Sequence, residues 1–211
     1  MGRPLEQVKQ RAIQHWFEDG LSEICIGVYF VSIGVLFLLQ TWPEPGSWLA
    51  GLLGLGTLVV VGLGVWLVRP LIRVLKERLA YPRTGYVAYH PPARLHRALS
   101  LFLGALMAAF FGWFILSYSQ TTSAWLPVLE ALALAVPAFV IGQRAGLIRF
   151  YLYALITIVI SAGLSLSGTG DLVGTAWVFI AAGLVMAFSG LVVFILYLRN
   201  VRPPQEAPDG D

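Results

Sequence analysis

The sequence has few charged residues. Asp, Glu, Lys and Arg make up 12% of its 211 residues, whereas apolar residues make up 58%. A soluble domain usually carries about 25% charged residues, so this chain has too little polar surface to cover a particle in water. Together with a mean hydropathy of +0.78, the shortage excludes the ordinary soluble globular class and predicts that lipid surrounds most of the chain.

Residue types that build catalytic and metal sites are also scarce. Cys25 is the only cysteine and lies inside an apolar run, which excludes a disulfide framework and a cysteine-based metal site. His15, His90 and His96 all lie outside the apolar runs, so none of them can hold a haem between spans. The chain contains no HExxH, GxSxG, phosphate-loop or dinucleotide-binding pattern. We therefore expect no cofactor, no metal and no enzymatic activity.

Six long apolar segments are present, and a helix needs about 20 residues to cross a bilayer. They lie at 21–40, 48–68, 98–118, 125–142, 150–166 and 173–198. Short polar turns join the first segment to the second, the third to the fourth and the fifth to the sixth. The sequence thus predicts an all-α integral membrane bundle of six transmembrane helices, which forms one domain over residues 21–198.

The distribution of Lys and Arg predicts the orientation of this bundle. The three turns within the pairs, TWPEPGS, SQTTSA and SLSGTGD, contain no basic residue, and all fourteen Lys and Arg lie on the other side of the spans. The positive-inside rule then places both termini in the cytoplasm and the protein in the cytoplasmic (inner) membrane. Because the basic residues flank spans, they also explain the net charge of +3, and we expect no nucleic-acid partner.

The two ends of the chain have different compositions. Residues 1–20 are predicted to contain an amphipathic helix, because apolar residues repeat at helical spacing from Leu5 to Trp16. This helix either lies flat among the lipid headgroups or packs on the cytoplasmic ends of the bundle. The Pro-rich, acidic tail at 199–211 is predicted to be disordered.

Small residues recur inside two of the spans at spacings that let helices approach closely. They are Gly51, Gly54, Gly62 and Gly64 in the second span, and Gly183, Ala187 and Gly190 in the sixth. We interpret both sets as packing faces between spans of one chain rather than as a dimer motif.

The longest polar interval, residues 69–97, contains seven of the fourteen basic residues. Cations next to a bilayer attract anionic phospholipid headgroups by about 1 kcal/mol for each Lys or Arg near the surface. The side chains expected to contact headgroups, or a membrane or cytosolic protein partner, are Arg73, Lys76, Arg78, Tyr81, Arg83 and Tyr86. The alternative is a positive-inside loop that folds as a cap under the bundle.

Within this interval, residues 76–87 read KERLAYPRTGYV. The run resembles a segment with the pattern K-x-R-x-x-Y-P-R-x-G-Y-V that is shared by uncharacterised prokaryotic multispanning membrane proteins. The resemblance covers these twelve residues and brings no activity with it. It implies only that the segment has a specific geometry.

Two carboxylates lie within the predicted spans. Glu23 is near the cytoplasmic end of the first span, where we expect it to reach water or a cytoplasmic arginine. Glu130 lies five residues beyond Trp125, about 7.5 Å deep at helical rise, on a side of the membrane with no Lys or Arg. Pro137 follows and should free the carbonyl of Ala133 from its helical hydrogen bond. Many transporters build an ion site from a broken helix and a carboxylate.

Glu130 therefore has two interpretations. It is either a proton or cation site, or a protonated acid hydrogen-bonded to a neighbouring span or to Tyr118, because burial disfavours the charged form. Two function classes follow. The first is a non-enzymatic scaffold or accessory subunit that uses the 69–97 segment, and the second is a small transporter or channel-like protein that uses Glu130. The scarcity of polar residues in the spans favours the first, because a transport path should show further carboxylates and scattered Ser and Thr.

Overall fold

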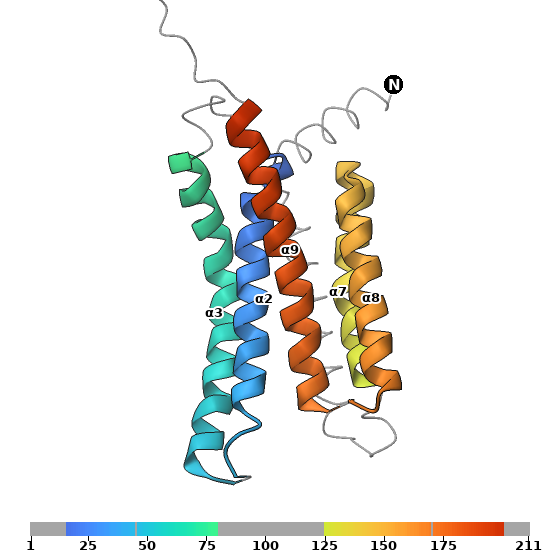
Figure 1. Ribbon diagram of the computed structural model, residues 1–211. Coiled ribbons are helices and arrows are strands. Elements are labelled where there is room, and N and C mark those ends of the chain that lie inside the picture. Colours follow the sequence, from blue (N-terminus) through green and yellow to red (C-terminus); the bar gives the residue numbers. More distant parts are fainter. Residues whose placement is uncertain (1–15, 45, 80–124, 170, 201–211) are drawn as a thin grey trace, which may run out of the picture.

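The structure, a computed structural model, describes residues 16–44, 46–79, 125–169 and 171–200 (Figure 1). Within these residues the chain is helical and contains no strand. The helices are α2 (Leu21–Leu39), α3 (Trp48–Leu79), α7 (Leu126–Ala145), α8 (Ile148–Leu166) and α9 (Leu172–Asn200). Three predicted elements lie outside the described residues: the amphipathic helix up to residue 15, the third span at 98–118, and the tail after residue 200.

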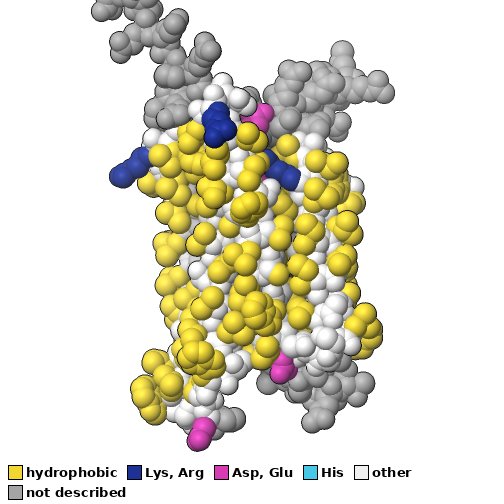
Figure 2. Space-filling view, in the orientation of Figure 1, with side chains coloured by type: hydrophobic (Ala, Val, Ile, Leu, Met, Phe, Trp, Pro, Cys, Tyr) yellow, Lys and Arg dark blue, Asp and Glu magenta, His cyan; other side chains and the backbone are white. Residues whose placement is uncertain are grey.

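Several of these helices are long and apolar enough to cross a membrane. Four pass this test alone, namely α2, α7, α8 and α9, and α3 is a fifth if its two parts form one span. Apolar side chains cover the flank of the bundle seen in Figure 2, and the charged side chains lie near its two ends. The prediction of an all-helical bundle with several membrane-compatible helices is confirmed. The count of six stays a prediction, because the third span lies outside the described residues.

Helix α3 is longer than the predicted second span and is bent. Its parts Trp48–Gly64 and Trp66–Leu79 meet at 48°. Pro70 lies inside the helix and has no N–H to donate to the carbonyl four residues earlier, at Trp66, where the second part begins. The helix therefore changes direction near the predicted end of the span and continues into the basic interval as far as Leu79.

Helices α2 and α9 run antiparallel (Figure 1) and pack most closely among the described pairs. Gly20, Gly27 and Gly34 recur every seven residues along one side of α2 and its N-cap. A Cβ atom on any of them would overlap backbone atoms of α9, whose facing residues are Ala176, Ile180, Gly183, Ala187, Gly190 and Phe194. The prediction that Gly183, Ala187 and Gly190 form a packing face against another span is confirmed, and the two backbones approach closely because no side chain separates them.

Helix α3 packs against the other side of α2. The Tyr29 ring lies against Gly64, and its hydroxyl donates to the Val61 carbonyl at 2.8 Å. The predicted packing role of Gly64 is thus confirmed. Gly51, Gly54 and Gly62 meet no atom within 4 Å in the part of the chain that is described, so their role stays a prediction.

Helices α7 and α8 form a hairpin. The turn between them uses Gly146, which caps α7 with a left-handed backbone (φ 67°) that glycine adopts without strain. The rings of Phe139 and Tyr151 meet edge to face at 5.2 Å across the hairpin. The hairpin packs on the remaining described helices mainly through α9.

Candidate functional site: two buried ion pairs at the basic end

The described basic residues all lie at one end of the bundle, called the basic end below. This follows from the antiparallel arrangement in Figure 1, which brings the last turns of α3, α7 and α9 next to the first turn of α8. The residues are Arg69, Arg73, Lys76, Arg78, Arg144, Arg149 and Arg199. Glu44 and Asp171 lie in turns at the opposite end, and Figure 2 shows this separation on one face.

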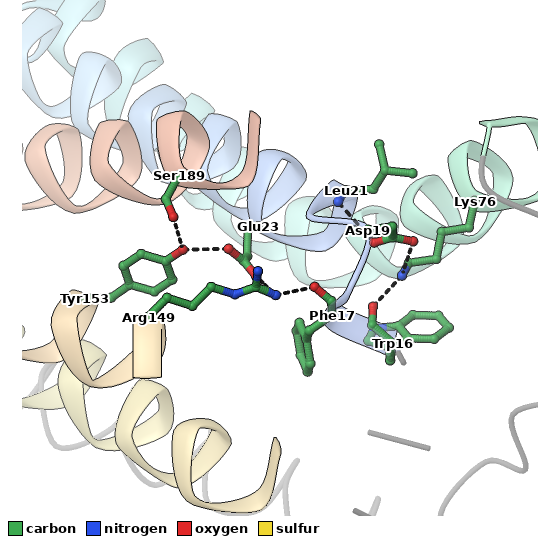
Figure 3. A network of polar contacts seen from close by, with 9 residues as sticks. All are labelled: Trp16, Phe17, Asp19, Leu21, Glu23, Lys76, Arg149, Tyr153 and Ser189. Atoms are coloured by element: carbon green, nitrogen blue, oxygen red, sulfur yellow. Dashed lines mark hydrogen bonds and ion pairs between the residues drawn. The ribbon is translucent and has the colours of Figure 1, made fainter. Parts of the chain in front are cut away.

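The first buried ion pair joins the start of α2 to the end of α3. The Lys76 ammonium lies 2.7 Å from an Asp19 carboxylate oxygen, donates to the Trp16 carbonyl and sits over the Trp16 ring (Figure 3). The other Asp19 oxygen accepts the backbone N–H of Leu21 at 3.1 Å. Burial lowers the pKa of Lys76, and the adjacent Asp19 carboxylate opposes that shift. Lys76, which is only 1% exposed, is therefore committed to contacts inside the protein.

The second buried ion pair is the centre of a cluster from three helices, called the Glu23 cluster below: Glu23, Arg149, Tyr153 and Ser189 (Figure 3). Arg149 lies 2.8 Å from one Glu23 oxygen and also donates to the Phe17 carbonyl. The Tyr153 hydroxyl donates to the other Glu23 oxygen at 2.5 Å and lies 2.7 Å from the Ser189 hydroxyl. Glu23 on α2 is thus bound by α8, and α8 is in turn bound to α9.

The hydrogen bonding around the Glu23 cluster is incomplete. The Nε atom of Arg149 and the hydroxyl of Ser22, which is next to Glu23 in sequence, are buried without a hydrogen-bond partner among the described residues. Asp19 and Lys76 have no such atom. A buried polar group without a partner loses its hydration and gains nothing in exchange, so the two ion pairs differ in how well the protein satisfies them.

A row of buried hydroxyl groups continues from the Glu23 cluster along α8. Tyr153, Thr157, Ser161 and Ser165 recur every four residues and are all buried. Thr157 and Ser161 donate to carbonyls one turn earlier in their own helix, at 2.7 and 2.8 Å. The Ser165 hydroxyl, at the far end of the row, has no partner among the described residues.

Glu130 lies towards the opposite end of the bundle. The Thr175 hydroxyl on α9 donates to one of its carboxylate oxygens at 2.9 Å. The other oxygen is buried without a partner in the described part of the chain. Of the two predicted partners, a neighbouring helix is therefore the observed one, and Tyr118 lies outside the described residues. Pro137 lies inside α7, as the sequence predicts.

The predicted contact residues of the 69–97 segment differ in their positions. Arg73 and Arg78 are exposed at the end of α3, as contact with headgroups requires. Lys76 is buried and paired, so the expectation that it contacts headgroups needs correction. Tyr81, Arg83 and Tyr86 lie outside the described residues, and their role stays a prediction.

The Glu23 cluster was not predicted as a site. The expectation that Glu23 reaches an arginine is confirmed, because Arg149 binds it, but the alternative of contact with water is wrong, because Glu23 is 0% exposed. The signal in the sequence was a carboxylate near the end of one span and an arginine at the same predicted depth in another.

Within the described residues, no group of three or more His, Cys, Asp or Glu side chains is placed to hold a metal ion. Comparison of the chain with protein-family models, curated proteins and solved structures found no match. Fold and polar contacts therefore define only a coarse class: a helical bundle compatible with a multi-pass membrane protein.

Proposed function

We propose that the protein is a non-enzymatic scaffold or accessory subunit of the cytoplasmic membrane, with six spans and both termini in the cytoplasm. In this proposal the basic segment 69–97 contacts anionic phospholipid headgroups or a cytosolic partner. The observation that supports it is the end of α3, where exposed Arg69, Arg73 and Arg78 project from a helix that buried Ile72 and Lys76 fix to the bundle.

The fixed helix end favours headgroup binding for an electrostatic reason. Three guanidinium groups on a positioned helix lose less freedom on binding than the same groups on a free chain. Each also gains about 1 kcal/mol from an anionic surface. Exposed Trp66, at the bend of α3, is the residue type enriched where a helix leaves the hydrocarbon.

The experiment is a count of the anionic lipids that stay with the full chain after mild solubilisation, measured by mass spectrometry. The test variant carries Arg73→Gln, Arg78→Gln and Arg83→Gln, and leaves Lys76 in place because it is buried. A control variant carries Arg144→Gln and Arg199→Gln, which remove charge from the same end but not from the segment.

We expect the test variant to lose its anionic lipids and the control to keep most of them. Salt should weaken retention in the parent, because exposed charges are screened over about 8–10 Å at physiological ionic strength. Equal retention by parent and test variant would contradict lipid contact by the segment and leave only the cap.

The proposed orientation has its own test. In a Cys25→Ala background, single cysteines at Ser47 and Thr169 should react with an impermeant thiol reagent added outside intact cells, and a cysteine at Gln205 should not. Ser47 and Thr169 lie in turns at the end opposite the basic one. Labelling of Gln205 from outside would contradict the proposed orientation.

A second candidate function, a small transporter or channel-like protein that uses Glu130, is favoured by a different observation. A transport path should contain more than one carboxylate together with Ser and Thr. Buried Glu23, the hydroxyl row of α8 and the unpartnered oxygen of Glu130 meet that description. These groups lie on helices that contact one another, since α9 packs against both α8 and α7.

Glu130→Gln tests this second candidate. If Glu130 binds a proton or a cation, the parent should show a melting temperature that depends on pH or on an added alkali cation, and the variant should lose that dependence. Thr175→Val is the matched variant, because it removes the observed hydrogen bond but keeps the carboxyl group. Parallel melting curves for the parent and Glu130→Gln under all conditions would contradict an ion site.

A further inference from the structure

The described helices form two groups with different internal contacts. Helices α2, α3 and α9 are joined by the glycine contacts of α2 with α9 and by Tyr29 and Gln40, which bind backbone or side chain of α3. Helices α7 and α8 form a hairpin of their own. Figure 1 shows the hairpin beside α9, on the side away from α3.

Polar contacts connect these two groups near both ends. At the basic end, Arg149 and Tyr153 of the hairpin bind Glu23, and Tyr153 also meets Ser189. Towards the opposite end, Glu130 of the hairpin accepts the hydroxyl of Thr175. The Asp19–Lys76 pair lies at the same basic end but within the first group, because it joins the start of α2 to α3.

The Glu23 cluster has the properties of a contact that can open. Because Arg149 Nε and Ser22 are buried without partners, water that reached them would supply the missing hydrogen bonds, which lowers the free-energy difference between open and closed arrangements. Immediately beyond the cluster, the buried hydroxyls of Thr157 and Ser161 offer further partners for that water.

We propose that the Glu23 cluster is a lock that holds the α7–α8 hairpin against α2 and α9. Its opening moves the hairpin as a unit and admits water from the basic end to Thr157 and Ser161. The lock is independent of lipid binding by the 69–97 segment. It deepens the second candidate function, on which it rests for its purpose, because it is then the cytoplasmic gate of the path towards Glu130.

The experiment measures how fast a buried cysteine reacts in the full chain. Thr157→Cys is introduced in a Cys25→Ala background, the protein is placed in lipid nanodiscs, and labelling by a charged, membrane-impermeant maleimide is followed. The lock variant adds Glu23→Gln with Arg149→Gln, so that no buried charge is left unpaired. The control variant adds Asp19→Asn with Lys76→Gln, which removes the other ion pair at the same end.

We expect the lock variant to label at least about tenfold faster than the parent, the factor that corresponds to loss of one hydrogen bond to a charged group. The control should label at the parent's rate. Equal rates in the lock variant and the parent would overturn the lock, and so would an equal increase in lock variant and control, which indicates general loosening.

A milder variant guards against misfolding. Tyr153→Phe removes only one hydroxyl, and we expect it to increase labelling by a smaller factor while circular dichroism stays at the parent's value. Unchanged labelling in Tyr153→Phe with an unfolded lock variant would also overturn the proposal. Nanodiscs expose both ends of the protein, so failure here is independent of the orientation, of lipid retention and of the melting behaviour of Glu130→Gln.

Discussion

Helix α9 is in contact with two different surfaces. Towards α2 it presents small residues, and the two backbones touch without intervening side chains. Towards the α7–α8 hairpin it presents Thr175 and Ser189, which bind Glu130 and Tyr153. The same helix therefore takes part in one interface based on shape and in another in which polar bonds lie near both ends.

The difference concerns what each interface can do when it separates. Close backbone packing gains dispersion contacts, and water has no polar group to satisfy if α2 and α9 part. A carboxylate or a hydroxyl can instead exchange its protein partner for water. We therefore infer that α2 and α9 form the fixed part of the bundle and that the hairpin is the part able to move.

Breaking one partner of a buried ion pair should have the largest effect on stability. Arg149→Met leaves the Glu23 carboxylate buried without its cation, and such changes typically cost about 3–5 kcal/mol. Adding Glu23→Gln should restore most of the lost stability, because the uncompensated charge is then gone. Thermal unfolding in detergent measures both. Equal melting temperatures for the single and double variants would contradict an ion pair that matters in the folded protein.

Filling the glycine contact should have the next largest effect. A Cβ atom at Gly27 would overlap the backbone nitrogen of Ala187 and the carbonyl oxygen of Gly183, which cannot turn aside as a side chain can. We expect Gly27→Val to lower the free energy of unfolding by about 1–3 kcal/mol. Gly163→Val in α8 is the control, since nothing described lies within 4 Å there. Similar losses in both variants would show that helix propensity, not contact, is responsible.

Removing the bond near the opposite end should have the smallest effect. Thr175→Val keeps the shape of the side chain but removes the hydroxyl that binds Glu130, which should cost about 1 kcal/mol. Thr41→Val is the matched control, because the exposed Thr41 hydroxyl binds only the Leu38 carbonyl nearby in sequence. The interface account fails at this end if the two variants melt at the same temperature.

The sequence predicted the helices well and their neighbours poorly. The span at 150–166 matches α8 (Ile148–Leu166) within two residues, because long apolar runs specify a spanning helix directly. Gly20, Gly27 and Gly34 were visible at a regular spacing, but spacing alone does not say which helix they face. That information lies in the complementary series on α9, far away in the chain.

The ion pairs show the same limit. Asp19 with Lys76 and Glu23 with Arg149 each join residues that are distant in sequence, and no local pattern links them. The positive-inside rule counts Lys76 and Arg149 as flanking charges, and it does not distinguish a cation that faces headgroups from one that binds a buried acid. Only the packing of α3 and α8 against α2 decides between these roles.

A distance measurement between spin labels tests the division into a fixed and a movable part most directly. In the Cys25→Ala background, exposed Leu191 on α9 is paired with exposed Val28 on α2 or with exposed Leu152 on α8. Each pair is examined with and without Glu23→Gln and Arg149→Gln. We predict that the Val28–Leu191 distance stays narrow and unchanged, while the Leu152–Leu191 distance lengthens or broadens in the variant. Identical behaviour of the two pairs, whether both change or neither does, would contradict it.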